Sequence, residues 1–291
     1  MKSILVPLRG HDHEAETIRV ALRLGSLDHA HVRCLVARPS AETLAVAFAR
    51  QGMADSEPVL REAAATARRA EIRVRWVIQA ALAELGAPEV GPREPAAEGF
   101  SCAIATTDAL IAEATAAEAP FHDLIIYEPC RGPWRDLLLA PQVVDDPVLE
   151  AVLRSAARPV LLGCRKLRDG LPRSIGVASG RGASAARAAS AALPLLRRSP
   201  SVQVMRVEIG GPADDHDPLV DYLARHQVAA SLERQDPAGK SIAAALVTLA
   251  IERDLDLMVM GGGRAIAGSA TLSSVAAAVL HQAPFPLLLG P

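Results

Sequence analysis

The chain repeats a segment of its own sequence without a gap. Residues 148–163 read VLEAVLRSAARPVLLG and align on residues 275–290, which read VAAAVLHQAPFPLLLG. The starts match as well, because residues 3–7 align on 174–178, and residues 123–127 align on 256–260. Such self-similarity indicates a duplicated structural unit. We therefore predict two tandem domains, residues 1–165 and 172–291, joined by a charged linker at 165–173 that contains a Gly and a Pro.

Within each half, short apolar runs alternate with alanine-rich helical segments. This pattern predicts an α/β fold with a parallel sheet covered on both faces. The expected strands of the first half lie near residues 3–8, 32–37, 72–78, 123–127 and 159–163. Those of the second half lie near 174–178, 202–208, 228–233, 256–260 and 285–289, and the clearest helices near 14–27, 183–197 and 241–253. We expect two doubly wound, Rossmann-like domains with five-stranded sheets, related by a pseudo-two-fold axis, and a surface loop at 86–99.

Composition limits the location and the classes of partner. Half of the 291 residues are hydrophobic, so each half can bury a core, yet no run approaches the roughly 18 apolar residues of a membrane helix. Strand 3–8 leaves no room for a signal peptide, so we expect a cytoplasmic protein. A net charge of −2 and 3% aromatic residues argue against nucleic-acid binding. The four cysteines have no metal-binding spacing and are expected to be reduced thiols.

The last crossover of the second half has the character of an anion site. Gly261, Gly262 and Gly263 follow an apolar strand and would let a ligand approach the backbone closely. Ser273 and Ser274 open the next helix, where hydroxyl and free N–H groups can receive a phosphate. Arg264 lies between them and could bind a phosphate or be a surface charge.

On these residues the chain resembles the universal stress protein family in its tandem form. ATP-binding members of that family have a Gly, two residues, a second Gly, nine residues, a third Gly and then Ser or Thr. Gly261 matches the first glycine, and Gly263 matches the second if one residue is deleted. Ser273 replaces the third glycine and Ser274 is the hydroxyl residue. The resemblance implies a non-enzymatic stress-response protein, with ATP or AMP bound in the C-terminal domain.

Two departures from the family pattern affect the expected site. The family's aspartate after the first strand, which contacts the nucleoside, is replaced by Arg9 in the first copy and Gly180 in the second. In the first copy, Asp146 and Pro147 replace the serine pair, and a carboxylate repels phosphate while proline lacks the N–H that would bind it. We therefore expect no nucleotide in the first half and at most one in the chain. The predicted cofactor-binding residues are Gly180, Gly261, Gly263, Arg264, Ser273 and Ser274.

Three alternatives stand beside this interpretation. The loop 179–184, Ser-Gly-Arg-Gly-Ala-Ser, faintly resembles the pyrophosphate loop of ATP pyrophosphatases, which would make the chain an adenylating enzyme. The chain could instead be a structural or partner-interaction module that binds no nucleotide. Residues 11–13, His-Asp-His, could hold a metal, although Asp is also common at helix starts.

The family resemblance also implies that the domains pair through their last strands. Residues 160–162 and 287–289 are apolar enough to cover each other's edges. We expect this pairing within one chain, with a homodimer as a further assembly.

Overall fold

The structure is a computed structural model of the whole chain. It describes residues 1–11, 13–50, 56–91, 99–129, 146–155, 158–164, 167, 171–180, 182–208, 216–266 and 269–290. The chain divides into two compact units, residues 1–128 and 129–291. No described helix is both long and apolar enough to span a bilayer.

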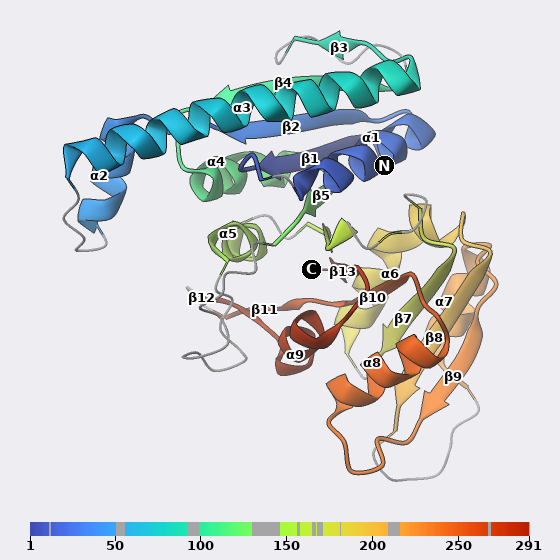
Figure 1. Cartoon of the computed structure of the whole chain (residues 1–291). Helices are drawn as coiled ribbons and strands as arrows, with labels where there is room; N and C mark the ends of the chain where they lie inside the picture. The colour runs from blue at the N-terminus through green and yellow to red at the C-terminus, as the bar shows by residue number, and fades with distance from the viewer. Residues whose placement is uncertain are drawn as a thin grey trace. The chain divides into compact units, whose positions relative to one another are not determined.

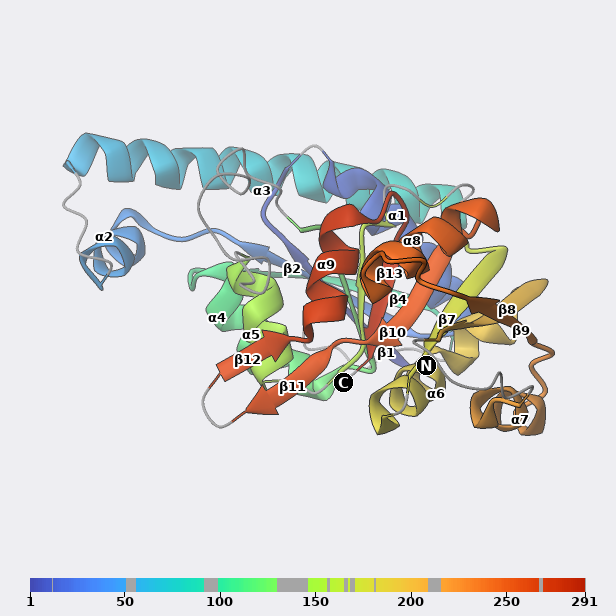
Figure 2. The same ribbon diagram turned by 90° about the horizontal axis from the view of Figure 1, so that it is seen from below.

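The first unit is a parallel sheet with helices on both faces (Figure 1). Its strands lie in the order β3-β4-β2-β1-β5 and every pair in that series is parallel. The helices α1 and α3 pack against each other, and Figure 2 shows α4 on the other side of the sheet. The elements are β1 Ser3–Leu8, α1 Glu14–Asp28, β2 His31–Ala37, α2 Ala41–Arg50, α3 Glu57–Leu85, β3 Glu89–Val90, β4 Ser101–Thr107, α4 Ile111–Glu118, the 3-10 turn η1 Ala119–Phe121 and β5 Leu124–Tyr127.

The second unit repeats this order and adds a hairpin and strand β6. Its sheet runs β6-β13-β10-β7-β8-β9, with parallel pairs from β13 to β9. Helix α6 packs on β10 and β13, whereas α8 packs on α9, β8 and β9. The elements are α5 Pro147–Ser155, β6 Val160–Leu162, β7 Ser174–Ser179, α6 Ala183–Leu196, β8 Ser201–Val207, α7 Pro218–Arg225, β9 Ser231–Gln235, α8 Ile242–Glu252, β10 Leu257–Gly261, β11 Gly263–Ile266, β12 Ser269–Leu272, α9 Ser274–Gln282 and β13 Leu287–Gly290.

The α/β class and the mostly parallel sheets are confirmed. In the first unit β1 lies between β2 and β5, and in the second unit β7 lies between β8 and β10. This central position of the first strand is the order expected of a duplicated doubly wound fold. The pseudo-two-fold axis stays a prediction.

The predicted strand near residues 72–78 is wrong, because these residues lie inside helix α3. Ile72, Val74 and Trp76 alternate with Arg73 and Arg75 as a strand would. However, Val74 and Ile78 are buried, while the side chains of Ile72 and Trp76 are 69% and 71% exposed. The helical period therefore prevails over the alternation. The missing strand is β4, which lies beyond the predicted loop at 86–99. Within that loop, residues 89–90 form the short strand β3, which pairs with β4, and residues 92–98 are outside the described part.

Strand β6 lies in the second unit, although sequence similarity places it at the end of the first repeat. It pairs antiparallel with β13, so that Leu162 lies opposite Leu287 and Val160 opposite Leu289. These are the two apolar segments that are predicted from the sequence to cover each other's edges. For this reason the compact units divide at residue 128, ahead of the linker at 165–173. The pairing of whole domains stays a prediction.

Candidate functional site

Gly261 and Gly262 lie in the candidate site, at the carboxyl edge of the second sheet. Gly261 ends β10, and a Cβ on it would lie only 2.6 Å from the Cβ of Ser184 in the first turn of α6. The N–H of Gly262 donates to the carbonyl of Gly290 at 2.8 Å, which ties the end of β10 to the end of β13. The absence of a side chain at Gly261 therefore lets α6 begin directly against the end of β10.

The start of helix α9 lies at the same place. The Ser273 N–H donates to the carbonyl of Gly262 at 3.2 Å, and the Ser273 hydroxyl caps the helix by accepting from the Ala276 N–H at 3.1 Å. Ser274 is the first residue of α9, and both serines are exposed. The structure thus brings together Gly261, Ser273 and Ser274, as the sequence analysis grouped them, and adds the start of α6.

The segment between Gly261 and Ser273 is a hairpin, although its many small residues are more typical of an irregular loop. Strands β11 and β12 pair antiparallel, with Gly263 opposite Leu272 and Ile266 opposite Ser269. Isoleucine and threonine favour extended backbone, which gives a physical reason for this difference. Gly263 and Arg264 open β11, and the side chain of Arg264 lies outside the described part of the structure.

Gly180 follows β7 at the same edge of the sheet. It is exposed, and a Cβ on it would have no neighbour within 4 Å. Gly182 is the N-cap of α6 and provides no side-chain acceptor for the first N–H groups of that helix. The first turn of α6 is therefore without a side-chain cap, which leaves its N–H groups available to an anion.

A carboxylate that is not among the residues predicted from the sequence lies beside the end of β7. Asp217 is the N-cap of α7 and accepts from the Leu219 N–H at 2.9 Å. Its other oxygen accepts from the Ser179 hydroxyl at 2.6 Å and lies 3.7 Å from the Arg206 guanidinium. The side chain is 5% exposed, so Asp217 links β7, β8 and α7 internally. An Asp followed by Pro before an apolar run is a helix-start signal, and this could have identified it.

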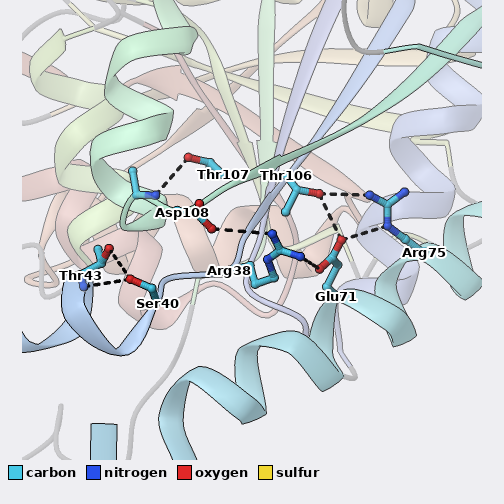
Figure 3. Close-up of polar contacts among 9 residues, drawn as sticks. Arg38, Ser40, Thr43, Glu71, Arg75, Thr106, Thr107 and Asp108 are labelled. Carbon is cyan, nitrogen blue, oxygen red and sulfur yellow. Dashed lines mark hydrogen bonds and ion pairs between the residues drawn. The ribbon is translucent and has the colours of Figure 1, made fainter. Parts of the chain in front are cut away.

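The first unit has a different set of charges at its carboxyl edge (Figure 3). The Glu71 carboxylate of α3 binds Arg75 at 3.1 Å and Arg38 at 3.3 Å, and it accepts from the Thr106 hydroxyl at 3.2 Å. Arg38 also lies 3.8 Å from Asp108. The cluster ties α3 to the ends of β2 and β4, and its carboxylates neutralise its two arginines. It has the chemistry of a structural clamp rather than of an anion site.

The remaining candidates from the sequence give no metal or thiol site within the described residues. The rings of His11 and His13 stack at 5.2 Å, while Asp12 lies outside that part of the chain. No described group of three or more His, Cys, Asp or Glu residues could hold a metal ion. Cys34 and Cys102 are free and buried, and a hydrogen bond between them together with burial raises the pKa of Cys34.

Comparisons with known proteins agree with this architecture. Over almost its whole length the chain resembles a universal stress protein from Archaeoglobus fulgidus DSM 4304, with a TM-score of 0.62, 16% identity, and coverage of 99% of this chain and 95% of the other. A functionally unknown protein from Pseudomonas aeruginosa PAO1 gives a TM-score of 0.53, 17% identity and coverage of 99% and 92%. At these identities the likeness concerns the fold alone.

Sequence comparisons point to one family. A search of curated proteins found no match. Residues 172–291 match the model of the universal stress protein family. This range begins just before β7, ends with β13, and contains both helix starts of the candidate site. Residues 172–291 are therefore a domain of the universal stress protein family.

Proposed function

We propose that this chain is a non-enzymatic stress-response protein that binds one adenine nucleotide in its second unit. The observation that carries the proposal is the meeting of two helix starts at the end of β10. Ser184 of α6 contacts Gly261, and Ser273 at the start of α9 donates its N–H to Gly262. Helix N-termini carry partial positive charge and free N–H groups, which favour phosphate.

The position of the site in the sheet agrees with a nucleotide ligand. Ligands of doubly wound folds bind at the carboxyl ends of the strands, where the order of the sheet reverses. In the second unit the strand order reverses between the adjacent strands β7 and β10. Strands β8 and β9 follow beyond β7, and β13 follows beyond β10. Gly180 follows the first of these strands and Gly261 ends the second, so the predicted residues flank the reversal.

Calorimetric titration with ATP tests the proposal. We expect at most one site per chain, and we expect Ser274→Asp to weaken binding by at least roughly tenfold, because its carboxylate would meet the phosphates. Ser241→Asp is the matched control, since Ser241 is the N-cap of α8 in the same unit and Asp is also a good N-cap. Two equivalent sites, or equal affinities for the two variants, would contradict the proposed site.

The absence of catalytic groups in the sequence of the loops supports a binding role. Phosphoryl transfer needs a metal held by carboxylates and a group that orients the nucleophile. Residues 261–274 and 179–184 contain no Asp or Glu. Asp217 lies nearby but is engaged by Ser179 and the first turn of α7. Incubation with ATP and magnesium should therefore release phosphate no faster than buffer alone. Multiple-turnover hydrolysis that Ser274→Ala abolishes would instead support an enzyme.

One observation favours the alternative of a module without a nucleotide. The space beside Gly261 is filled by the protein's own Ser184, so it is not open to a ligand. If that contact is the whole reason for the glycine, the second unit is a structural domain that serves a partner. Mass spectrometry of the natively purified protein separates the two, since a copurifying adenine nucleotide is expected only from the binding function. A cytoplasmic location and assembly as a homodimer are part of the same proposal.

A further inference from the structure

In the first unit, the loop between β1 and α1 forms a backbone anion site that is already filled. The N–H of Arg9 donates to Oε1 of Glu14 at 2.9 Å. The N–H groups of Gly10 and His11 donate to Oε2 at 2.7 and 3.1 Å. Three N–H groups converging on one carboxylate are the arrangement by which a backbone nest binds an anion. The Glu14 residue is only 2% exposed, so the anion held here is internal.

The rest of the loop is closed around that carboxylate. Gly10 has φ +85°, a value that favours glycine, and a Cβ on it would lie 2.2 Å from the Cβ of Ala70 in α3. The Gly10 carbonyl accepts from the Arg73 guanidinium at 3.0 Å. Arg9 lies over the ring of Tyr127, 5.5 Å from its centroid, at the end of β5. Helix α3 and the end of β5 thus fix the loop in the conformation that points its N–H groups at Glu14.

The corresponding loop of the second unit lacks this carboxylate. Extending the match between residues 3–7 and 174–178 without a gap places Ala185 opposite Glu14. Helix α6 has Gly182 as its N-cap, with no side-chain hydrogen bond. The first repeat also differs at its last helix, α5, where the Asp146 carboxylate accepts from the N–H groups of Val148 and Leu149 at 3.0 and 3.2 Å. In the first repeat, therefore, both of these helix starts hold a carboxylate of the chain itself.

We propose that Glu14 is a built-in anionic occupant of the first unit, which closes the β1–α1 loop to phosphate-bearing ligands. A ligand phosphate would have to displace a buried carboxylate from three hydrogen bonds and remain beside its charge. The chain then has one unit whose anion site is satisfied internally and one whose helix starts remain available. This inference goes beyond the proposed function, because it holds whether or not the second unit binds a nucleotide.

Removal of the carboxylate tests the proposal by chemical rescue. Glu14→Ala leaves a space in which formate can replace the lost group. We expect formate to raise the unfolding temperature of this variant saturably and to slow amide exchange at Gly10 and His11 by roughly tenfold. Chloride at equal ionic strength should have no such effect. Glu71→Ala is the matched control. It also removes a carboxylate from the first unit, one that links α3 to β4, but this carboxylate is held by side chains and not by a backbone nest. A folded Glu14→Ala protein without saturable rescue, or equal rescue of both variants, overturns the proposal.

A second variant decides the question if Glu14→Ala does not fold. Glu14→Gln fills the same volume without the charge, so formate should not affect it. Because its neutral amide is a weaker acceptor than a carboxylate, the Gly10 and His11 amides should exchange roughly tenfold faster than in the wild-type protein. Equal exchange of these amides in the wild type and Glu14→Gln would overturn the proposal. All of these measurements report on residues of the first unit and use no nucleotide, so a failure here is distinct from a failure of the proposed nucleotide site.

Discussion

Mild acid should destabilise the first unit through His122, which lies between η1 and β5. The side chain is 6% exposed, and its Nδ1 forms a 2.7 Å hydrogen bond with the Ser3 hydroxyl. Its pKa is lowered from 6.5 to about 4, chiefly because the ring is buried; Glu118 and Asp123 oppose this shift, and Arg33 and His31 contribute to it. Folding therefore favours the neutral imidazole, and protonation opposes folding.

The size of the effect follows from the two pKa values. Between pH 6.5 and pH 4 the unfolded chain binds a proton that the folded unit does not, so the stability is fully present above pH 6.5 and is lost as the pH falls toward 4. With these values the loss is about 2 kcal/mol by pH 5. In His122→Gln the amide can still bond to Ser3 but does not titrate in this range. The wild type should therefore lose about 2 kcal/mol more than the variant between pH 7.5 and pH 5.

Hydrogen exchange of β1 and β5 under native conditions reports on the first unit itself, whereas an unfolding transition of the whole chain would combine the two units. The other carboxylates and His31 are present in both proteins, so their titration largely cancels in the comparison. If the two proteins lose stability in parallel, within about 0.5 kcal/mol, burial of a neutral His122 is not the source of the acid sensitivity.

Two further predictions concern packing and charge. Glu71→Gln should lower the stability of the first unit by roughly 1–3 kcal/mol, because Arg38 and Arg75 lose their shared carboxylate. Urea unfolding measures this loss. The control is Glu16→Gln, which removes the exposed ion pair with Arg19 and should cost under about 0.5 kcal/mol. Gly290→Ala should cost at least roughly 1–3 kcal/mol, since its Cβ would lie 2.3 Å from the Ala188 Cα. Gly180→Ala, with nothing within 4 Å, should leave the unfolding temperature nearly unchanged, and similar shifts for both glycine variants would refute the packing argument.

Most of the sheet could be predicted from the sequence, because buried parallel strands are short apolar runs with clear ends. Strand β1 matches its predicted range, and the predicted second-half strands overlap β7 to β10 and β13. The failure lies at residues 72–78, where Ile72, Val74 and Trp76 alternate with arginines and so imitate a strand within a short window. Only a longer window, from Leu60 through Ala64 to Leu82 on one buried face, shows the helical period. Strand β4 was missed because its residues Ser101, Thr106 and Thr107 are polar at the ends, next to a Gly- and Pro-rich segment.

The candidate site could be predicted only where its groups are close in sequence. Ser273 lies ten residues after Gly263 within one strand-to-helix connection, so its proximity to the glycine run can be predicted from the sequence. The contact of Gly261 with Ser184 and the bond of Asp217 to Ser179 join segments 77 and 38 residues apart, and only the sheet order brings them together. Glu14 lies five residues from Arg9, yet it was missed for another reason. A first-turn glutamate ordinarily faces solvent, and only the left-handed Gly10, held by α3, turns the N–H groups toward it. The feature that best separates the two repeats therefore depends on a tertiary contact, which no local pattern contains.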